Sequence, residues 1–500
     1  MLTVITFLPL LVCVLLLGPR ALPDRVCQWV WIGTAAADLA LVVALWAGFD
    51  TGGGTQYEQR ARWIPGAGVG YHLGVDGLSL PLVAVTCVLF LAVAAHCPRE
   101  TRRVRSYVCL FLFLQTVCVG LFVALDLILF FVFFDLSIVG MFFVVAGWGH
   151  GEKARAAALK FFLYTFTGSL ALLLGFIGLY LAASPHTFDI VELARTDPLA
   201  GRGTYAALVL LAIGVGLAVK TPTVPFHTWL PPAHSEAPAT GSAILAGVLL
   251  KMGTYGFLRI AMPLLPGSWR RYALVVIVVG AVSVVHGALV ALAQTDFKRM
   301  IAYTSVNHMG YVILAVGAAG VLAGTDSRAR ALAVTGAVTQ MVSHGLLTGA
   351  LFLLSGVLHD RGGTYAIGAY SGLAGPSPRF AALTAVAAFG SLGIPGLSGF
   401  VAEFQILTGS LASQATATAI ALTGIVLTAA LFLRALRRMF LGPEVLPPAV
   451  GAGGFGDLAA AESSAVTGLL VLALIIGVLP RFLLDVIEPA SRTVVGLVAR

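Results

Sequence analysis

The chain has 500 residues, of which 59% are hydrophobic and 10% are charged, and its mean hydropathy is +0.97. Soluble domains carry about 25% charged residues, so this composition excludes a soluble globular protein and predicts an all-α polytopic membrane protein. The net charge of +8 does not indicate nucleic-acid binding, because the basic residues lie in short loops between apolar runs.

Apolar runs that can cross a bilayer follow one another along the chain. A spanning helix needs about 20 apolar residues, and this rule predicts about 14 spans. Their approximate ranges are Met1–Leu17, Val30–Phe49, Leu80–Ala95, Tyr107–Ala124, Leu127–Ala146, Ala156–Ala182, Tyr205–Trp229, Thr240–Met262, Tyr272–Ala293, Met300–Val321, Ala331–Leu358, Ala381–Ser410, Ala415–Phe440 and Ala465–Leu484. The first run lacks the charged start of a signal peptide, so we expect it to remain as a span. Between the second and third spans, the Gly-rich polar segment Asp50–Ser79 predicts a short surface hairpin.

The seventh span is interrupted. Its apolar run reaches Lys220 and is then broken by Pro222, Pro225, Pro231 and Pro232. A proline removes a backbone donor and clashes with the preceding turn. Inside a bilayer this is tolerated only where neighbouring protein or trapped water satisfies the freed carbonyls. The break therefore marks a place where the backbone lines the interior of the bundle.

A second interruption lies in the twelfth span, in the segment FGSLGIPGLSGFVAEFQIL, where Pro395 and several glycines precede Glu403. Paired interruptions at corresponding places point to a transporter with inverted repeats. The sequence thus predicts two inverted-topology five-helix repeats, each containing one broken helix. The expected domains are the N-terminal spans with the surface hairpin (1–105), the first repeat (106–262), the second repeat (272–440) and the C-terminal span and tail (441–500).

Ionisable side chains lie inside these apolar spans. Asp135, Lys251 and His344 stand in long apolar runs, while Lys220 and Glu403 stand beside the two breaks. Charged groups are costly in hydrocarbon, so an intramembrane ionisable residue is a functional candidate. Acids, lysines and imidazoles in successive spans form the series of groups that a proton relay requires. The alternatives are static structural ion pairs, or lysines satisfied by backbone carbonyls.

The remaining buried ionisable groups carry weaker signals. His308 lies near a helix start, and a lone buried histidine is more often a hydrogen-bonded core residue. His227 and His234 flank the first break, where capping of freed carbonyls explains them. Asp38 and His286 have no partner that the sequence identifies, and we interpret both as structural.

The cysteines are scattered, with no CxxC pair, so cysteine supplies no iron–sulfur or zinc site. No GxGxxG or P-loop stands between a strand and a helix, and no cofactor is expected. The six cysteines are Cys13, Cys27, Cys87, Cys97, Cys109 and Cys118.

Loop charges predict the orientation. Lys and Arg are more numerous after odd-numbered spans, as with Arg20, Arg99, Lys153, Lys298 and Arg437. Positively charged loops stay in the cytoplasm, so both termini are expected outside.

Three segments carry a family resemblance: KTPTVPFHTWLPPAHSEAPATGSAILAGVLLKMGTYGFLR (220–259), DFKRMIAYTSVNHMGYVIL (296–314) and VSHGLLTGALFLLSG (342–356). They closely resemble the antiporter-like membrane subunits of respiratory complex I, over most of the chain. Within that family the chain resembles the NuoM type. Its late broken helix carries Glu403, where the NuoL and NuoN types carry lysine, and it ends soon after the last predicted span, without the long lateral helix of the NuoL type.

The resemblance implies a role for each candidate residue. Asp135 matches the fifth-span glutamate that pairs with the seventh-span lysine, here Lys220. The family has glutamate followed by proline in that span, whereas this chain has Asp135 and Gly140. Aspartate is one methylene shorter, so its reach to Lys220 is expected to need water or a helix shift.

The other implied roles follow along the chain. Lys251 matches the connecting lysine of the eighth span, and His308 and His344 match the central-axis histidines. Glu403 matches the terminal proton-exit carboxylate.

The resemblance implies a proton-translocating subunit of NADH:quinone oxidoreductase in the bacterial inner membrane. Its expected partners are NuoL-type and NuoN-type neighbours and the small core membrane subunits, which would leave flavin, iron–sulfur and quinone chemistry to other chains. The alternatives are a Mrp-type sodium/proton antiporter subunit, a membrane-bound hydrogenase subunit, or a membrane scaffold whose charges form static pairs.

Overall fold

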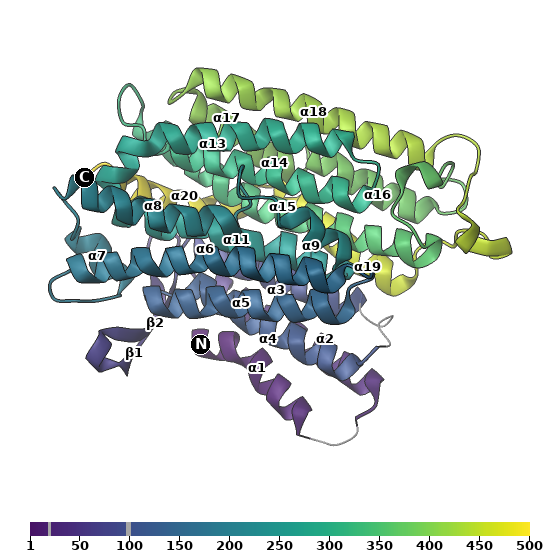
Figure 1. Cartoon of the computed structure of the whole chain (residues 1–500), viewed down its shortest axis with the longest axis horizontal. Helices are drawn as coiled ribbons and strands as arrows, with labels where there is room; N and C mark the ends of the chain where they lie inside the picture. Colours follow the sequence, from purple (N-terminus) through teal and green to yellow (C-terminus); the bar gives the residue numbers. More distant parts are fainter. Residues whose placement is uncertain (19–21, 97–101) are drawn as a thin grey trace.

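The computed structural model describes residues 1–18, 22–96 and 102–500, so Arg20, Cys97 and Arg99 lie outside it. The chain forms a bundle whose long helices run side by side along the longest axis of the molecule (Figure 1).

The first half contains the helices α1 (Leu2–Leu17), α2 (Asp24–Ala47), α3 (Ser79–His96), α4 (Val104–Val123), α5 (Leu127–Trp148), α6 (Ala154–Ala182), α7 (Ile190–Thr196), α8 (Gly203–Lys220), α9 (Leu230–Glu236), α10 (Ala239–Ile244), α11 (Leu250–Gly256) and α12 (Met262–Leu264). The second half contains α13 (Pro266–Ala293), α14 (Phe297–Ala318), α15 (Ser327–Gly362), α16 (Pro378–Ser391), α17 (Ser398–Leu411), α18 (Ala415–Phe440), α19 (Ala460–Val478) and α20 (Arg481–Val498).

Within the described residues, 11 helical runs are long and apolar enough to cross a membrane. This confirms the predicted all-α polytopic membrane fold. Three further predicted spans correspond to the shorter apolar helix α1, to α14 and to the interrupted pair α16 and α17. The predicted total of about 14 spans and the inverted repeats remain predictions.

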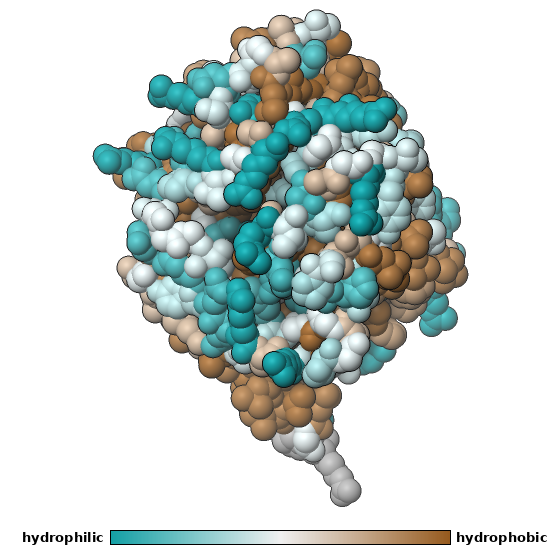
Figure 2. Space-filling view, turned by 90° about the vertical axis from the view of Figure 1, so that its left-hand side faces the viewer, coloured by the Kyte–Doolittle hydropathy of each residue, from teal (hydrophilic) through white to brown (hydrophobic). Residues whose placement is uncertain are grey.

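The predicted hairpin is present. Strands β1 (Gln56–Ile64) and β2 (Val69–Val75) pair antiparallel, and Gly68 takes a φ of +66° in the turn between them. The hairpin lies at the same end of the bundle as α7 and the C-terminus (Figure 1). Hydrophilic residues spread across the middle of this end, with hydrophobic residues toward its rim (Figure 2). This is the pattern expected where a membrane protein meets water.

Both predicted helix breaks are present, and side chains from neighbouring segments satisfy the first. After α8 ends at Lys220, the indole Nε1 of Trp229 donates to the Val219 carbonyl at 2.9 Å. The hydroxyl of Ser283 on α13 accepts from the Val224 backbone N–H at 3.0 Å. The second break separates α16 from α17, where Gly393 has a φ of +80°. Glycine adopts such a conformation without steric cost.

Two parts of the helix pattern differ from the sequence prediction. The predicted last span, Ala465–Leu484, is wrong at its end, because α19 stops at Val478 and α20 begins at Arg481. Pro480 separates the two helices, since proline cannot continue the hydrogen bonding of a helix. The eighth predicted span contains two π-helical segments, Leu245–Leu249 and Phe257–Ala261, which the hydrophobic pattern does not reveal.

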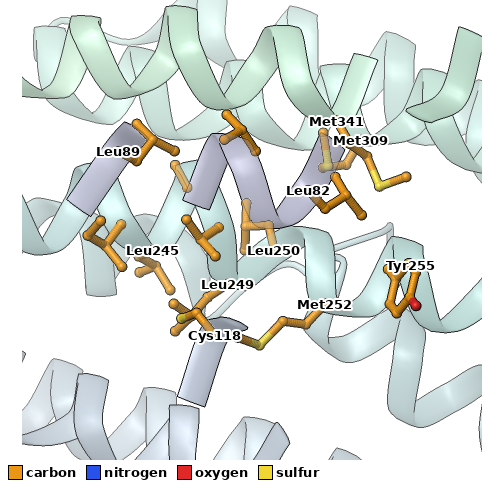
Figure 3. Packing of buried hydrophobic residues seen from close by; sticks show 14 of the residues in the cluster. Leu82, Leu89, Cys118, Leu245, Leu249, Leu250, Met252, Tyr255, Met309 and Met341 are labelled. Atoms are coloured by element: carbon orange, nitrogen blue, oxygen red, sulfur yellow. The ribbon is translucent and has the colours of Figure 1, made fainter. Parts of the chain in front are cut away.

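Helix α15 lies in the interior and packs against α3, α10, α14, α16, α17, α19 and α20. Around α10 and α11, Leu245, Leu249 and Leu250 pack among apolar side chains that include Leu89 and Met341 (Figure 3). Close packing of this kind holds side chains in fixed rotamers. It therefore fixes the position of Lys251, which belongs to α11.

Candidate proton-transfer site

Lys251 lies at the centre of the site, and its side chain is 1% exposed. Its Nζ lies at hydrogen-bond distance, 2.6 Å, from His344 Nδ1 on α15 and donates to the Ala246 carbonyl. Ala246 belongs to the first π-helical segment, five residues earlier, and π-bulges are frequent at functional sites. When Nδ1 accepts this bond, His344 is neutral and any proton on its ring stays on Nε2. The contact thus joins two ionisable groups from separate helices.

The two predicted central histidines lie together. The ring centroids of His308, on α14, and His344 are 5.3 Å apart, with the rings nearly perpendicular at 89°. Within the described part of the chain, neither nitrogen of His308 has a partner at hydrogen-bond geometry, although the Ser391 backbone lies close enough to act on the ring, and Nε2 of His344 has no partner either. Buried polar atoms are normally paired, and exceptions call for an explanation such as a catalytic role. These nitrogens are available to accept or release protons.

Glu403 on α17 is 4% exposed, and His308, His344 and Gln340 line the same narrow space. Its carboxylate lies against Gly393, where an added Cβ would come within 2.5 Å of Oε2. The space is too tight to hold a water molecule in this conformation. Transfer from the histidines to Glu403 therefore requires a movement of side chains or of the second break.

Lys220 forms a second centre, and the structure does not pair it directly with Asp135. Lys220 is 1% exposed, and its ammonium donates to Ser137 Oγ at 2.8 Å and lies 4.7 Å from the Phe134 ring centroid. No ion pair within 4.0 Å involves Asp135 among the described residues, and Asp135 Oδ1 has no hydrogen-bond partner there. Residues two apart on a helix point in widely different directions. Ser137 therefore bonds to Lys220, while Asp135 lies near enough to act on the ammonium only through its charge.

The two centres are adjacent but are not joined in this conformation. Helices α8 and α11 pack closely, since a Cβ at Gly253 would come within 2.8 Å of the Thr221 backbone nitrogen. Across the described residues, no hydrogen bond links Lys220 or Ser137 to Lys251. Passage of a proton between the centres requires a rearrangement.

Sequence reasoning missed the partner of His227. Its Nε2 lies 3.2 Å from Nε2 of His286, on α13. His286 is one turn along from Ser283, which accepts from the backbone of the same break. The period of α13 places these two polar residues on one face, and that spacing is the signal that could have identified the pair.

The structure also shows the surroundings of His234 and Asp38, the other two weaker candidates. His234 is buried and stacks on Phe352, with ring centroids 4.5 Å apart, and within the described chain neither ring nitrogen is hydrogen-bonded. It does not cap freed carbonyls as the sequence suggested. Asp38 Oδ2 accepts from the amide of Gln115 at 2.7 Å and lies 3.7 Å from the thiol of Cys87. Its polar neighbours come from α3 and α4, which the sequence did not indicate.

A largely buried ion pair near the hairpin lies apart from the transfer groups. Arg259 donates to Asp76 Oδ1 at 2.6 Å and to Tyr255 at 2.9 Å. Burial raises the pKa of Asp76, but the Arg259 guanidinium and the backbone N–H groups of Ser79 and Leu78 outweigh it, so the pKa lies below its usual value. Asp76 is therefore ionised at neutral pH and anchors the loop between β2 and α3.

Comparison with known proteins places the chain in a family. A family model described as NADH:quinone oxidoreductase/Mrp antiporter, TM, matches residues 124–428. Subunit M of NADH-quinone oxidoreductase from Rickettsia bellii is 36% identical over 490 residues, covering 96% of this chain and 95% of the relative.

Solved structures agree. Respiratory complex I from Thermus thermophilus contains a chain with a TM-score of 0.87 and 30% identity, covering 100% of both chains. The Mrp complex from Dietzia contains one with a TM-score of 0.83 and 24% identity, covering 100% of this chain and 99% of that one, a likeness of fold alone. The chain therefore belongs to the NADH:quinone oxidoreductase/Mrp antiporter family of transmembrane proteins, and within it to the M subunits of NADH-quinone oxidoreductase.

Proposed function

We propose that this chain moves protons across the membrane as a membrane-arm subunit of NADH-quinone oxidoreductase, with quinone reduction taking place in other subunits. The contact between Lys251 and His344 carries the proposal. Both side chains are about 1% exposed, and among the described residues neither forms an ion pair. A static structural role would favour a carboxylate partner for a buried lysine. A lysine bonded to a neutral imidazole is instead able to hand on its proton.

The relay that we propose begins at Lys220. The Lys220 ammonium alternates between two partners on α5. These are Ser137, which it contacts in this structure, and Asp135. Formation of the ion pair with Asp135 holds the proton on Lys220, and its opening releases the proton toward Lys251. Because the two centres are not joined, this step is controlled by movement of the first break.

The second part of the relay runs through the histidines. Lys251 passes its proton to His344 Nδ1, and the imidazole releases a proton from Nε2 toward His308 or Glu403. Glu403 receives it when the tight space around Gly393 opens, and releases it on the other side. Proton uptake involves His234, which lies close enough to Lys298 and Lys251 for the charges of both to act on its ring.

The proposed surroundings follow from the relatives. The partners are NuoL-type and NuoN-type neighbours and the small core membrane subunits, embedded in the lipid of a bacterial inner membrane. Flavin, iron–sulfur and quinone chemistry belongs to those other chains. Both termini lie outside, and the Lys- and Arg-rich loops lie in the cytoplasm.

The proposal is tested with the whole complex in proteoliposomes. Lys220→Ala and Glu403→Ala should assemble and oxidise NADH while fewer protons are pumped per electron. The matched control is Lys160→Ala, which removes an exposed lysine on α6. An assembled Lys220→Ala variant with the normal proton-to-electron ratio would defeat the proposal. Purification in mild detergent tests the alternative: an NADH-oxidising arm supports this function, and a set of small Mrp partners supports an antiporter.

A further inference from the structure

Three side chains that commonly bind metals meet at the end of the bundle away from the hairpin. His150 follows the end of α5, and His359 and Asp360 stand in the last turn of α15. One ligand atom from each of the three lies within 4.8 Å of the others, and the imidazole centroids of His150 and His359 are 5.0 Å apart. The group has no part in the proposed relay.

The two imidazoles are held in place without using their ring nitrogens. His359 stacks on Tyr365, with ring centroids 4.5 Å apart at 23°. The backbone N–H of His150 donates to the Glu236 carbonyl at 3.0 Å, which ties the loop after α5 to the end of α9. Within the described residues, neither imidazole makes a hydrogen bond through its ring. Side chains fixed by packing with free nitrogen atoms are preorganised ligands.

The charges around the group accommodate a cation. Asp360, Glu236 and Asp296 all lie close enough to act on the buried ammonium of Lys298. Lys298 and Arg102 both act on His150, and Asp296 opposes Lys298 at His359. Among the charged side chains named here, three carboxylates therefore stand against two cationic groups.

We propose that His150, His359 and Asp360 bind a divalent transition-metal ion of the Zn²⁺ class. Two imidazole nitrogens and one carboxylate oxygen suit Zn²⁺ or Ni²⁺, whereas Ca²⁺ and Mg²⁺ prefer oxygen ligands alone. Three protein ligands leave a fourth position for water. The ion links the loop between α5 and α6 to α15.

The effect that we expect this metal ion to have on proton pumping rests on the proposed function. Helix α15 also carries His344, and the loop that the metal clamps begins at the end of α5, which carries Ser137. A metal that fixes these elements to each other restricts the movements needed to join the two centres. Occupied sites should therefore slow pumping.

The test is a Zn²⁺ titration of the intact purified complex against a chromophoric chelator. The wild type should bind one equivalent of Zn²⁺ more than the double variant His150→Ala/His359→Ala. The variant Asp360→Asn should bind this additional equivalent with an affinity at least about tenfold lower. The control is His186→Ala, which removes an exposed histidine elsewhere and should bind as the wild type does. The proposed site is refuted if the double variant binds as many equivalents of Zn²⁺ as the wild type.

The second measurement separates this inference from the proposed function. In proteoliposomes, Zn²⁺ at the concentration that fills the site should lower pumping by the wild type but not by the double variant. If the metal binds as expected but Zn²⁺ changes pumping equally in the wild type and the double variant, the metal site stands and its effect on the relay is refuted. If Lys220→Ala pumps normally while the Zn²⁺ equivalent is present, the proposed function fails and the site remains.

Discussion

The hydroxyl of Ser137 provides the sharpest prediction, because it is the observed partner of Lys220. Ser137 Oγ donates to the Phe134 carbonyl at 2.6 Å, which turns an oxygen lone pair toward the Lys220 ammonium at 2.8 Å. Ser137→Ala removes this acceptor from a site where Lys220 is 1% exposed. The remaining acceptor of comparable strength nearby is Asp135, whose Oδ1 has no hydrogen-bond partner in the described structure.

The size of the effect follows from the lost bond. A hydrogen bond to a charged group contributes about 1.5–3 kcal/mol. Since about 1.4 kcal/mol is a factor of ten, Ser137→Ala should shift the balance between Lys220–Ser137 and Lys220–Asp135 contacts by about 10- to 150-fold. The change therefore favours the ion pair with Asp135, which holds the proton on Lys220.

Infrared difference spectroscopy of the reconstituted complex measures this shift. The carboxylate band of Asp135, identified by its loss in Asp135→Asn, should grow in Ser137→Ala, and the proton-to-electron ratio should fall. Ser137→Thr keeps the hydroxyl and should resemble the wild type. An unchanged carboxylate band together with unchanged pumping in Ser137→Ala would refute the two-partner reasoning.

Three further predictions concern other parts of the molecule. His286→Leu removes the imidazole contact at the first break, worth about 1 kcal/mol, and should lower the proton-to-electron ratio, whereas His286→Gln should restore most of it; equal ratios for the two variants would contradict the role of this bond. Gly399→Ala places a methyl group against a backbone oxygen of α16, so thermal unfolding should show a loss of about 1–3 kcal/mol, while Gly468→Ala, with open space around it, should be neutral. Asp76→Asn should lower the melting temperature by an amount that stays constant from pH 8 to about pH 5 and shrinks below about pH 4. Because Arg259 holds the pKa of Asp76 below its usual value, the stability that Asp76 contributes is lost only as pH falls through that lowered pKa. A steep pH dependence of the difference between pH 6 and 8 would contradict this reasoning.

Much of the fold could be predicted because its determinants are local. Spans follow from the length of apolar runs, and Pro222 and Pro395 end helices for steric reasons that do not depend on the rest of the chain. The hairpin follows in the same way from glycines and short alternating strands. The error at the end of the last span arose because Pro480 stands within an apolar run whose second part, α20, forms a separate helix.

The site was predicted in composition but not in its contacts. The pattern placed Lys251 and His344 inside apolar spans, but it did not indicate that the two side chains bond directly to each other. The two π-helical segments, which lie before and after the helix that carries Lys251, change no hydrophobic period that a sequence reveals. Pairing depends on small shifts in helix register that only the packed bundle determines.

Partners from distant segments were the least predictable. Ser137 is a common residue in transmembrane helices, and nothing local identifies it as the acceptor for a lysine 83 positions later. His286 and His227 are 59 positions apart and meet only because α13 lies against the first break. The hydrophobic pattern indicated the ionisable residues, while the structure shows neutral residues such as Ser137 that bond to them.

The contact between Lys251 and His344 is tested most directly by a double-mutant cycle on proton pumping. Lys251→Met, His344→Leu and the double variant are each assembled, reconstituted and compared for protons moved per electron at equal rates of NADH oxidation. If the two groups form one relay, each single variant abolishes the share of pumping that this subunit contributes, and the double variant loses nothing more. Partial losses that add in the double variant, or a normal ratio in any assembled variant, would contradict a relay through this bond.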